Sequence, residues 1–189
     1  MKMTKKIFII PALLLAVIGV FAFAMIPLSM DNSSPDSISI EYNSNVCKTV
    51  TRADGTVEPT ECDHNLLYNS GKELIEAYLG DTGGATDEVD QISLCDSATP
   101  TNCGTPAADA SETFLTITDR GLSETTGTYA SLGVGNWTIS NTFTATASVT
   151  TAGTRLQNTA AVNFAGNAFT EVSLESGDQL SIEWNIWIS

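Results

Sequence analysis

The chain has 189 residues, which is enough for a targeting segment and one domain of ordinary size. It carries 22 acidic residues against 8 basic ones, so its formal net charge at pH 7 is −14. Nucleic acids and anionic lipid surfaces bind clustered lysine and arginine side chains, and this charge balance excludes both classes of partner.

The N-terminal segment, residues 1–30, is predicted to be a signal peptide or a membrane anchor. Three lysines among the first six residues precede an uncharged apolar stretch, residues 7–28, and the positive end of such a segment stays in the cytoplasm. The stretch is long enough to span a bilayer, yet Ala22-Phe23-Ala24 also matches a small-x-small cleavage site. Both interpretations stay open, and both place the rest of the chain outside the membrane.

The domain that follows is predicted to be all-β. Residues 31–36 form a polar linker with one proline, and residues 37–42 then alternate polar with apolar side chains, as a half-buried strand does. We expect residues 37–189 to form a single antiparallel β-sandwich, Ig-like or of the jelly-roll type, with one short helix.

Four cysteines lie beyond the apolar segment, as the close pairs Cys47/Cys62 and Cys95/Cys103. In an oxidising compartment this spacing favours the disulfides Cys47–Cys62 and Cys95–Cys103, although three pairings are possible. The residues between the members of each pair have no periodic apolar face and are predicted to be exposed loops. His64 is the only histidine, too few for a zinc or copper set.

The helix is predicted over residues 70–80. Ser70 and Glu73 have the spacing of a capping box, and Gly80 can end the helix. Its apolar face consists of Leu74, Ile75, Tyr78 and Leu79.

A group of carboxylates follows the helix: Asp81, Asp87, Glu88 and Asp90. Their oxygen atoms could bind a calcium ion, but Gly83 and Ala85 stand where the calcium-loop pattern requires ligands. A solvated loop is therefore favoured over a calcium site, and we expect no other cofactor.

The remainder alternates between strand-like segments and turns. Strands are predicted over residues 92–94, 113–118, 137–151, 162–164, 169–174 and 180–188. Residues 176–179 are predicted to join the last two strands as a hairpin. In the final strand one face holds Leu180, Ile182, Trp184, Ile186 and Ile188 and should point into the core. Trp187 falls on the other face, where we expect it to be exposed or covered by a neighbouring subunit.

The predicted strand 137–151 has serine or threonine at every even position from 138 to 150. This pattern favours a solvated face with hydroxyl pairs across strands; the alternatives are a flat hydroxyl surface for ice or sugar, or an O-glycosylated face. Trp137 shares the other face with Ile139 and Phe143, so we expect a core residue rather than a sugar-stacking platform. Asn32 and Asn136 match the N-glycosylation acceptor pattern.

The last third of the chain, with Trp137-Thr138-Ile139, a Ser176-Gly177-Asp178-Gln179 turn and a last alternating strand, resembles small β-sandwich virion or tail-fibre-associated proteins of tailed phages and related archaeal elements. The resemblance covers roughly 70 residues and implies a structural β-sandwich without a catalytic motif. It departs from that family at the N-terminus, because virion proteins assembled in the cytoplasm need neither an export leader nor disulfides. A host surface protein that shares the module fits the leader better.

Catalysis is not expected. A hydrolase site that uses histidine as its base would have only one histidine available in this chain. The favoured function is an extracellular structural or adhesive subunit of the cell surface, whose partners are further copies or other surface proteins. Assembly would use an exposed strand edge, either the last strand or the strand near Ser37. The alternatives are a membrane-anchored module that binds a carbohydrate or small ligand, and a virion-associated structural protein. A pocket or flat aromatic platform would favour the binding module.

Overall fold

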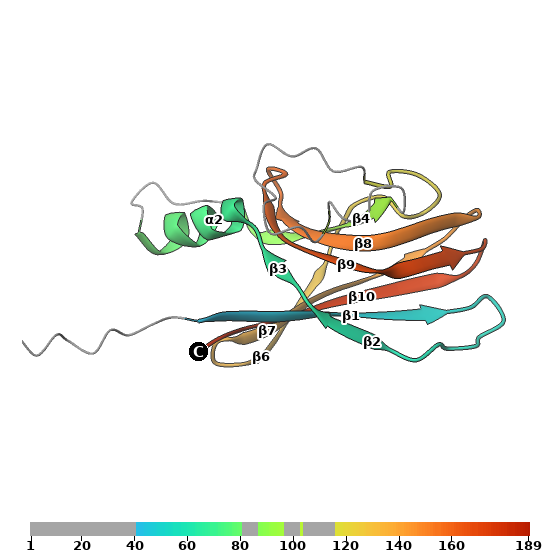
Figure 1. Ribbon diagram of the computed structural model, residues 1–189, viewed down its shortest axis with the longest axis horizontal. Helices are drawn as coiled ribbons and strands as arrows, with labels where there is room; N and C mark the ends of the chain where they lie inside the picture. Colours follow the sequence, from blue (N-terminus) through green and yellow to red (C-terminus); the bar gives the residue numbers. More distant parts are fainter. Residues whose placement is uncertain (1–40, 81–86, 97–102, 104–115) are drawn as a thin grey trace, which may run out of the picture. The chain divides into compact units, whose positions relative to one another are not determined.

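The computed structural model describes residues 41–80, 87–96, 103 and 116–189. These residues form a sandwich of two antiparallel sheets with one α-helix beside it, which confirms the predicted fold class (Figure 1). Residues 40–189 form one compact unit with its own core. The predicted leader, the linker and residues 37–40 lie outside the described residues.

Sheet A has five strands in the order β2-β1-β10-β7-β6. They are β1 (Tyr42–Thr51), β2 (Glu61–His64), β6 (Thr128–Gly133), β7 (Asn136–Thr144) and β10 (Gln179–Ile188). β10 pairs with β1 on one side and with β7 on the other, and β1 also pairs with β2. The last strand, which was expected to offer an edge for assembly, is therefore internal, and that expectation is wrong for β10. The other expected edge, the strand near Ser37, lies mostly outside the described residues, and β1, which begins at Tyr42, is internal.

Sheet B has five strands in the order β3-β9-β8-β4-β5. They are β3 (Leu66–Leu67), β4 (Val89–Asp96), β5 (Thr125–Thr126), β8 (Val149–Asn158) and β9 (Asn163–Leu174). The strand expected over residues 113–118 is reduced, in the residues that the structure describes, to a single bridge between Thr116 and Cys95.

The core lies between the two sheets and is clearest along β10. Leu180, Ile182, Trp184 and Ile186 are each at most 1% exposed, as the alternation predicts. Full burial of an aliphatic side chain contributes about 1.5–3 kcal/mol before entropy is subtracted. The predicted stripe stops one residue early, because Ile188 is 47% exposed at the end of the sandwich where a cavity opens.

The predicted strand 137–151 is in fact two strands in different sheets, β7 and β8. The chain turns at Ala145, whose N–H donates to the carbonyl oxygen of Asp178 and whose carbonyl oxygen accepts from Gly177 N–H. Conversely, the segments predicted separately over 162–164 and 169–174 belong to one continuous strand, β9.

The turn at residues 176–179 joins β9 of sheet B to β10 of sheet A, so it is a corner between sheets and not the predicted hairpin. Asp178 holds this corner: its side chain is 5% exposed and accepts hydrogen bonds from the N–H groups of Ala53 and Glu175. Its Oδ2 also lies 2.8 Å from Arg52 Nη1, and Arg52 forms a second ion pair with Glu58. The corner therefore joins both sheets through one carboxylate.

Four further strands differ from expectation, two in their boundaries and two in not having been predicted. β1 and β2 extend into the segment between Cys47 and Cys62, which was expected to be a loop. β5 and β6 were not predicted, because residues 125–133 mix small and polar side chains without clear alternation.

The helix is confirmed as α2 (Asn69–Gly80), but its first turn differs from the predicted capping box. Ser70 lies inside the helix, and its hydroxyl donates to the carbonyl oxygen of Asn163 on β9, 2.5 Å away. Gly71 packs against the backbone of Phe164, where a Cβ atom would come within 2.1 Å of the carbonyl oxygen. Ser70 therefore fixes the helix to sheet B instead of capping it.

Candidate functional site

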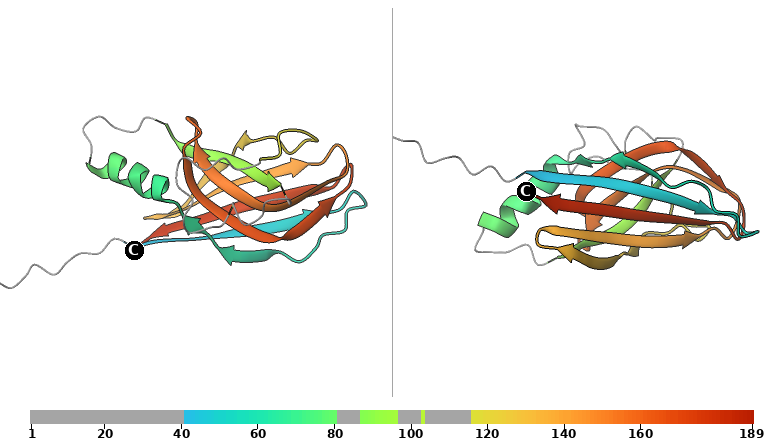
Figure 2. Two further views of the ribbon diagram at one scale, coloured as in Figure 1. Left: turned by 45° about the horizontal axis from the view of Figure 1, so that its top comes forward. Right: turned by 90° about the horizontal axis from the view of Figure 1, so that it is seen from below.

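A cavity of about 640 Å³ opens at the end of the sandwich where β1 begins and β10 ends. α2 lies at this same end in all three ribbon views (Figures 1 and 2). The cavity is lined by Tyr42, Ile75, Tyr78, Glu88, Val89, Asp90, Gly127, Tyr129, Trp137, Ile139, Phe164, Ile186 and Ile188. No basic residue, histidine or cysteine is among these lining residues.

Aromatic side chains from both sheets form much of the wall. Tyr42 of β1 contacts Phe164 of β9 edge to face, with ring centroids 5.7 Å apart and an interplanar angle of 79°. Trp137 of β7 is half-buried, packs against the core and lines the cavity. Trp137 was expected in the core; it lies instead at the edge of the core, partly buried, with part of its surface facing the cavity.

The tyrosine hydroxyls supply polar groups within this apolar wall. Burial raises the pKa of Tyr42, although hydrogen bonds with Ser44 and Asn65 oppose the shift. Burial also raises the pKa of Tyr78, and the negative charges of Asp87 and Glu88 add to the shift. Both phenols therefore remain protonated at neutral pH. The Tyr42 oxygen accepts from Ser44 and Asn65, and the Tyr78 O–H is donated within the chain.

Acidic side chains lie at one side of the cavity, where β4 begins. Glu88 is exposed, and Asp90 is half-buried, with its Oδ1 accepting from Gln91 Nε2 at 2.8 Å. The hydroxyl of Tyr78 donates to the carbonyl oxygen of Asp87 and so ties the end of α2 to this rim. The site thus combines aromatic faces with negative charge, an environment that favours cations over anions.

The predicted calcium ligands are only partly covered by the structure. Asp81 lies outside the described residues, while Asp87, Glu88 and Asp90 lie at the start of β4. In the parts of the chain that are described, no three acidic, histidine or cysteine side chains are grouped so that they could hold a metal ion. His64 is an exposed residue of β2, and its backbone carbonyl accepts a hydrogen bond from Asn167.

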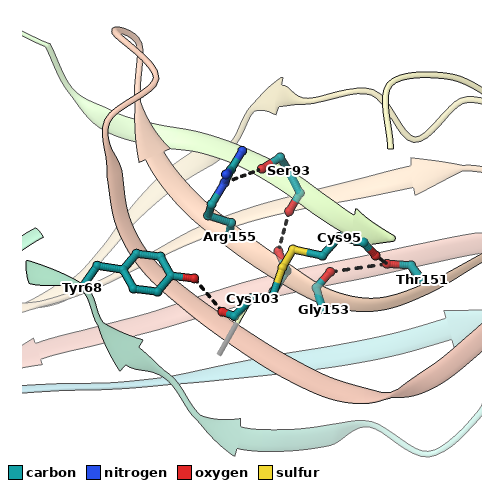
Figure 3. The surroundings of a disulfide bond; sticks show 8 residues. Tyr68, Ser93, Cys95, Cys103, Thr151, Gly153 and Arg155 are labelled. Carbon is teal, nitrogen blue, oxygen red and sulfur yellow. Dashed lines mark hydrogen bonds between the residues drawn. A yellow bond between two sulfur atoms is a disulfide. The ribbon is translucent and has the colours of Figure 1, made fainter. Parts of the chain in front are cut away.

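Both predicted disulfides are present. Cys47 and Cys62 face each other across β1 and β2. The Cys95–Cys103 disulfide holds Cys103 against the face of sheet B that points away from the core (Figure 3). There the hydroxyl of Tyr68 donates to the carbonyl oxygen of Cys103 at 2.6 Å.

Two glycines make room for this contact, and sequence reasoning missed them. A Cβ atom on Gly166 would lie 1.7 Å from the Tyr68 hydroxyl and 1.9 Å from the Cys103 carbonyl oxygen. A Cβ atom on Gly153 would lie 2.7 Å from Cys103 Cβ. Glycine inside a strand often marks a close approach by another part of the chain, which was the available signal.

The predicted surface sites lie on the solvent face of sheet A. Trp187 is half-buried, and its register neighbours are Asn43 of β1 and Asn136 of β7. Its role as an interface residue and the glycosylation of Asn136 stay predictions, and Asn32 lies outside the described residues.

The row of hydroxyl side chains is short. It runs along β7, where Thr142 and Ser181 of β10 form a hydroxyl pair at 2.8 Å. The neighbouring positions of β10 on that face hold Glu183, Asn185 and Trp187, so this strand supplies no matching hydroxyl array. The row thus contributes one cross-strand hydroxyl pair, while Thr138 is buried and Thr146 and Ser148 lie in the turn between β7 and β8.

Comparison of the chain with protein-family models, with curated proteins and with solved structures finds no match. Within the described residues, no helix is long and apolar enough to cross a membrane. The cavity was not predicted, because its walls come from segments far apart in the sequence that only the pairing of strands brings together.

Proposed function

We propose that this exported domain is a non-enzymatic binding module that holds a small apolar ligand in the cavity between its sheets. One observation carries the proposal: the cavity has a volume of about 640 Å³, within the 300–1,000 Å³ of ordinary ligand sites. Aromatic and aliphatic walls with a few polar groups are the usual composition of such sites. The disulfides support an extracellular location.

The rim chemistry narrows the class of ligand. Glu88 and Asp90 repel anions, and the aromatic faces of Tyr78, Tyr129 and Trp137 attract cations. The ligand that fits best has an apolar body of several carbon atoms and a neutral or cationic polar group. The predicted leader lies N-terminal to Tyr42, the first residue of the cavity wall. If the leader is retained after export, it holds the binding module at the membrane.

The experiment uses residues 31–189, which contain the whole compact unit. Titration with N-phenyl-1-naphthylamine, a neutral apolar dye, should give a saturable rise in fluorescence. The substitution Val89→Phe adds bulk at a half-buried position in the cavity wall and should weaken dye binding about tenfold, equivalent to about 1.4 kcal/mol. Val57→Phe is the matched control, because Val57 is 61% exposed and does not line the cavity.

Competition tests the charge preference. Hexyltrimethylammonium should displace the dye at a concentration about tenfold lower than hexyl sulfate does, because only the sulfate is repelled by the acidic rim. Equal dye binding by the two phenylalanine variants would refute the cavity as the site. Equal competition by the two ions would leave the cavity as the site but remove the role of Glu88 and Asp90.

A further inference from the structure

β6 forms one edge of sheet A and is exposed along its whole length. It pairs with β7 on one side, and in the residues that the structure describes no strand pairs with its other side. All six of its residues, Thr128–Gly133, are exposed. The right-hand view of Figure 2 shows β6 along the rim of the sheet, beside β7. Its outward N–H and C=O groups therefore form an open template for another strand.

The β6–β7 hairpin is also free of charge, which is unusual in this chain. No charged residue occurs between Glu124 and Arg155, although the chain has 22 acidic residues. β2, the opposite edge of the same sheet, carries Glu61 and Asp63. Natural proteins protect edge strands with charges, prolines or β-bulges. β6 contains no charge and no proline, and its one register irregularity lies between Ser131 and Gly133, at the end of the strand.

Large apolar side chains are exposed on and beside this strand. Tyr129 and Leu132 are 63% and 58% exposed, and Val134 in the following turn is fully exposed. Isolated exposed apolar residues are ordinary, but a group of them along an uncharged, unpaired edge marks an interaction site. The structure thus combines open main-chain groups, apolar side chains and absence of charge in one place.

We propose that β6 pairs antiparallel with β6 of a second copy of this chain, so that the two A sheets become continuous. A second copy is the partner that the charges favour. Two strongly acidic domains repel each other over most of their surfaces, and the uncharged hairpin is where two copies can approach without that cost. Pairing of the same strand about a two-fold axis is self-complementary and closes at the dimer. Main-chain hydrogen bonds supply the attraction, as in other strand additions. This inference does not depend on the proposed ligand.

The test uses charge exchange at Ala130, an exposed residue in the middle of β6. In residues 31–189 at 0.15 M salt, sedimentation velocity should show a monomer–dimer equilibrium that depends on concentration. Ala130→Lys and Ala130→Glu should each raise the dissociation constant about tenfold or more, because like charges meet across the axis. An equimolar mixture of the two variants should restore dimers, because lysine then faces glutamate. At concentrations below the dissociation constant of the unaltered chain, thermal unfolding of each variant should match that of the unaltered chain, because Ala130 is exposed in the monomer.

The matched controls are Ala160→Lys and Ala160→Glu, since Ala160 is an exposed alanine in the turn between β8 and β9 of the other sheet. These variants should dimerise like the unaltered chain. A protein that stays monomeric at all concentrations up to about 100 μM, well above the micromolar range of weak specific complexes, would overturn the proposal. Dimers that ignore the charge at residue 130, or that are not restored by mixing, would also overturn it. Monomers that instead bind phosphatidylcholine vesicles, and lose this binding on Val134→Ser, would show that the hairpin contacts lipid.

Discussion

β10 and β8 pack on the same core from opposite sheets, yet the pattern of buried residues along the two strands differs completely. Along β10 buried and accessible residues alternate, because sheet A has one face on the core and one on solvent. In β8 every residue except Thr150 is buried, because Cys103 covers part of the second face of sheet B. Sheet A thus has one face on the core, and in the described part of the chain no further strand pairs with its edges, while sheet B is covered on both faces at its centre.

This difference separates what each sheet can do. The covered face of sheet B buries polar side chains in contacts with its own chain, such as Arg155 Nε donating to Ser93 Oγ at 3.3 Å. In the described residues sheet A keeps its solvent face and the outer side of β6 open, so the proposed dimer surface is on sheet A. Sheet B contributes stability, and the cavity lies where both sheets end.

The largest difference in stability is expected between substitutions at the two ends of β10. Leu180→Ala should lower the free energy of unfolding by about 3 kcal/mol, because Leu180 is fully buried and its removal leaves a cavity. Ile188→Ala, on the same strand, should change the free energy of unfolding by less than about 0.5 kcal/mol, because Ile188 is 47% exposed. Urea unfolding of both variants measures the difference. Similar losses would mean that sheet A is covered at this end in solution.

The alternation along β10 explains why this part of the fold could be predicted from the sequence. Period-two hydrophobicity predicts a strand and its buried face directly, and it did so from residue 180 to 186. β8 does not alternate, because both of its faces are buried. The regular threonines of β7 continue through Ala145-Thr146-Ala147-Ser148, a turn without glycine, proline, asparagine or aspartate, so one strand was predicted where two exist.

The two disulfides should differ in their access to reductant. Cys62 lies on the exposed edge strand β2, whereas Cys95 and Cys103 are 1% and 0% exposed. Mild reductant should therefore open Cys47–Cys62 first, with a loss of about 3 kcal/mol for a loop of this length, while the domain stays folded. The Cys95–Cys103 disulfide should open only when Cys103 detaches from the outer face of sheet B.

Thiol labelling followed by mass spectrometry identifies which cysteines react. Circular dichroism recorded on the same samples shows whether the fold persists. If Cys95 and Cys103 react as quickly as Cys47 and Cys62, the outer face of sheet B is open in solution, contrary to the burial of these two cysteines.

A smaller loss of stability is expected when Gly166, which lies beneath Cys103 and Tyr68, is substituted. Gly166→Ala should cost about 2 kcal/mol, because its Cβ atom collides with the Tyr68 hydroxyl and with the backbone of Cys103. Gly80→Ala is the control, since a Cβ atom there meets nothing within 4 Å. In a chain that lacks the Cys95–Cys103 disulfide, the cost of Gly166→Ala should fall, because the covering segment can move away.

The candidate site was harder to predict than the fold for a related reason. Tyr42, Tyr129 and Phe164 stand in three strands of the two sheets, and no local pattern shows that they line one cavity. The cysteine pairs could be predicted, because their spacing in the chain is short. Asp178 shows the intermediate case: the turn was recognised, but its carboxylate joins the two sheets through Ala53 and Arg52, which are 125 and 126 positions away.

The smallest effect is expected in the acid dependence of that corner between the sheets. Hydrogen bonds from the N–H of Glu175, the guanidinium of Arg52 and the N–H of Ala53 hold the pKa of Asp178 below its ordinary value. The folded state therefore binds its proton less readily than the unfolded state. The stabilisation is present above the unfolded pKa and is lost as the pH falls through the lower folded pKa, from about pH 5 downward.

Asp178→Asn should be less stable at pH 7 but should lose less of its remaining stability on acidification. Glu171→Gln, a change at an exposed residue, should keep the acid dependence of the unaltered chain. Unfolding midpoints in urea between about pH 7 and pH 3 measure both slopes. Equal slopes for Asp178→Asn and the unaltered chain would mean that the carboxylate does not hold the sheets together in solution, and the acid sensitivity would then belong to other carboxylates.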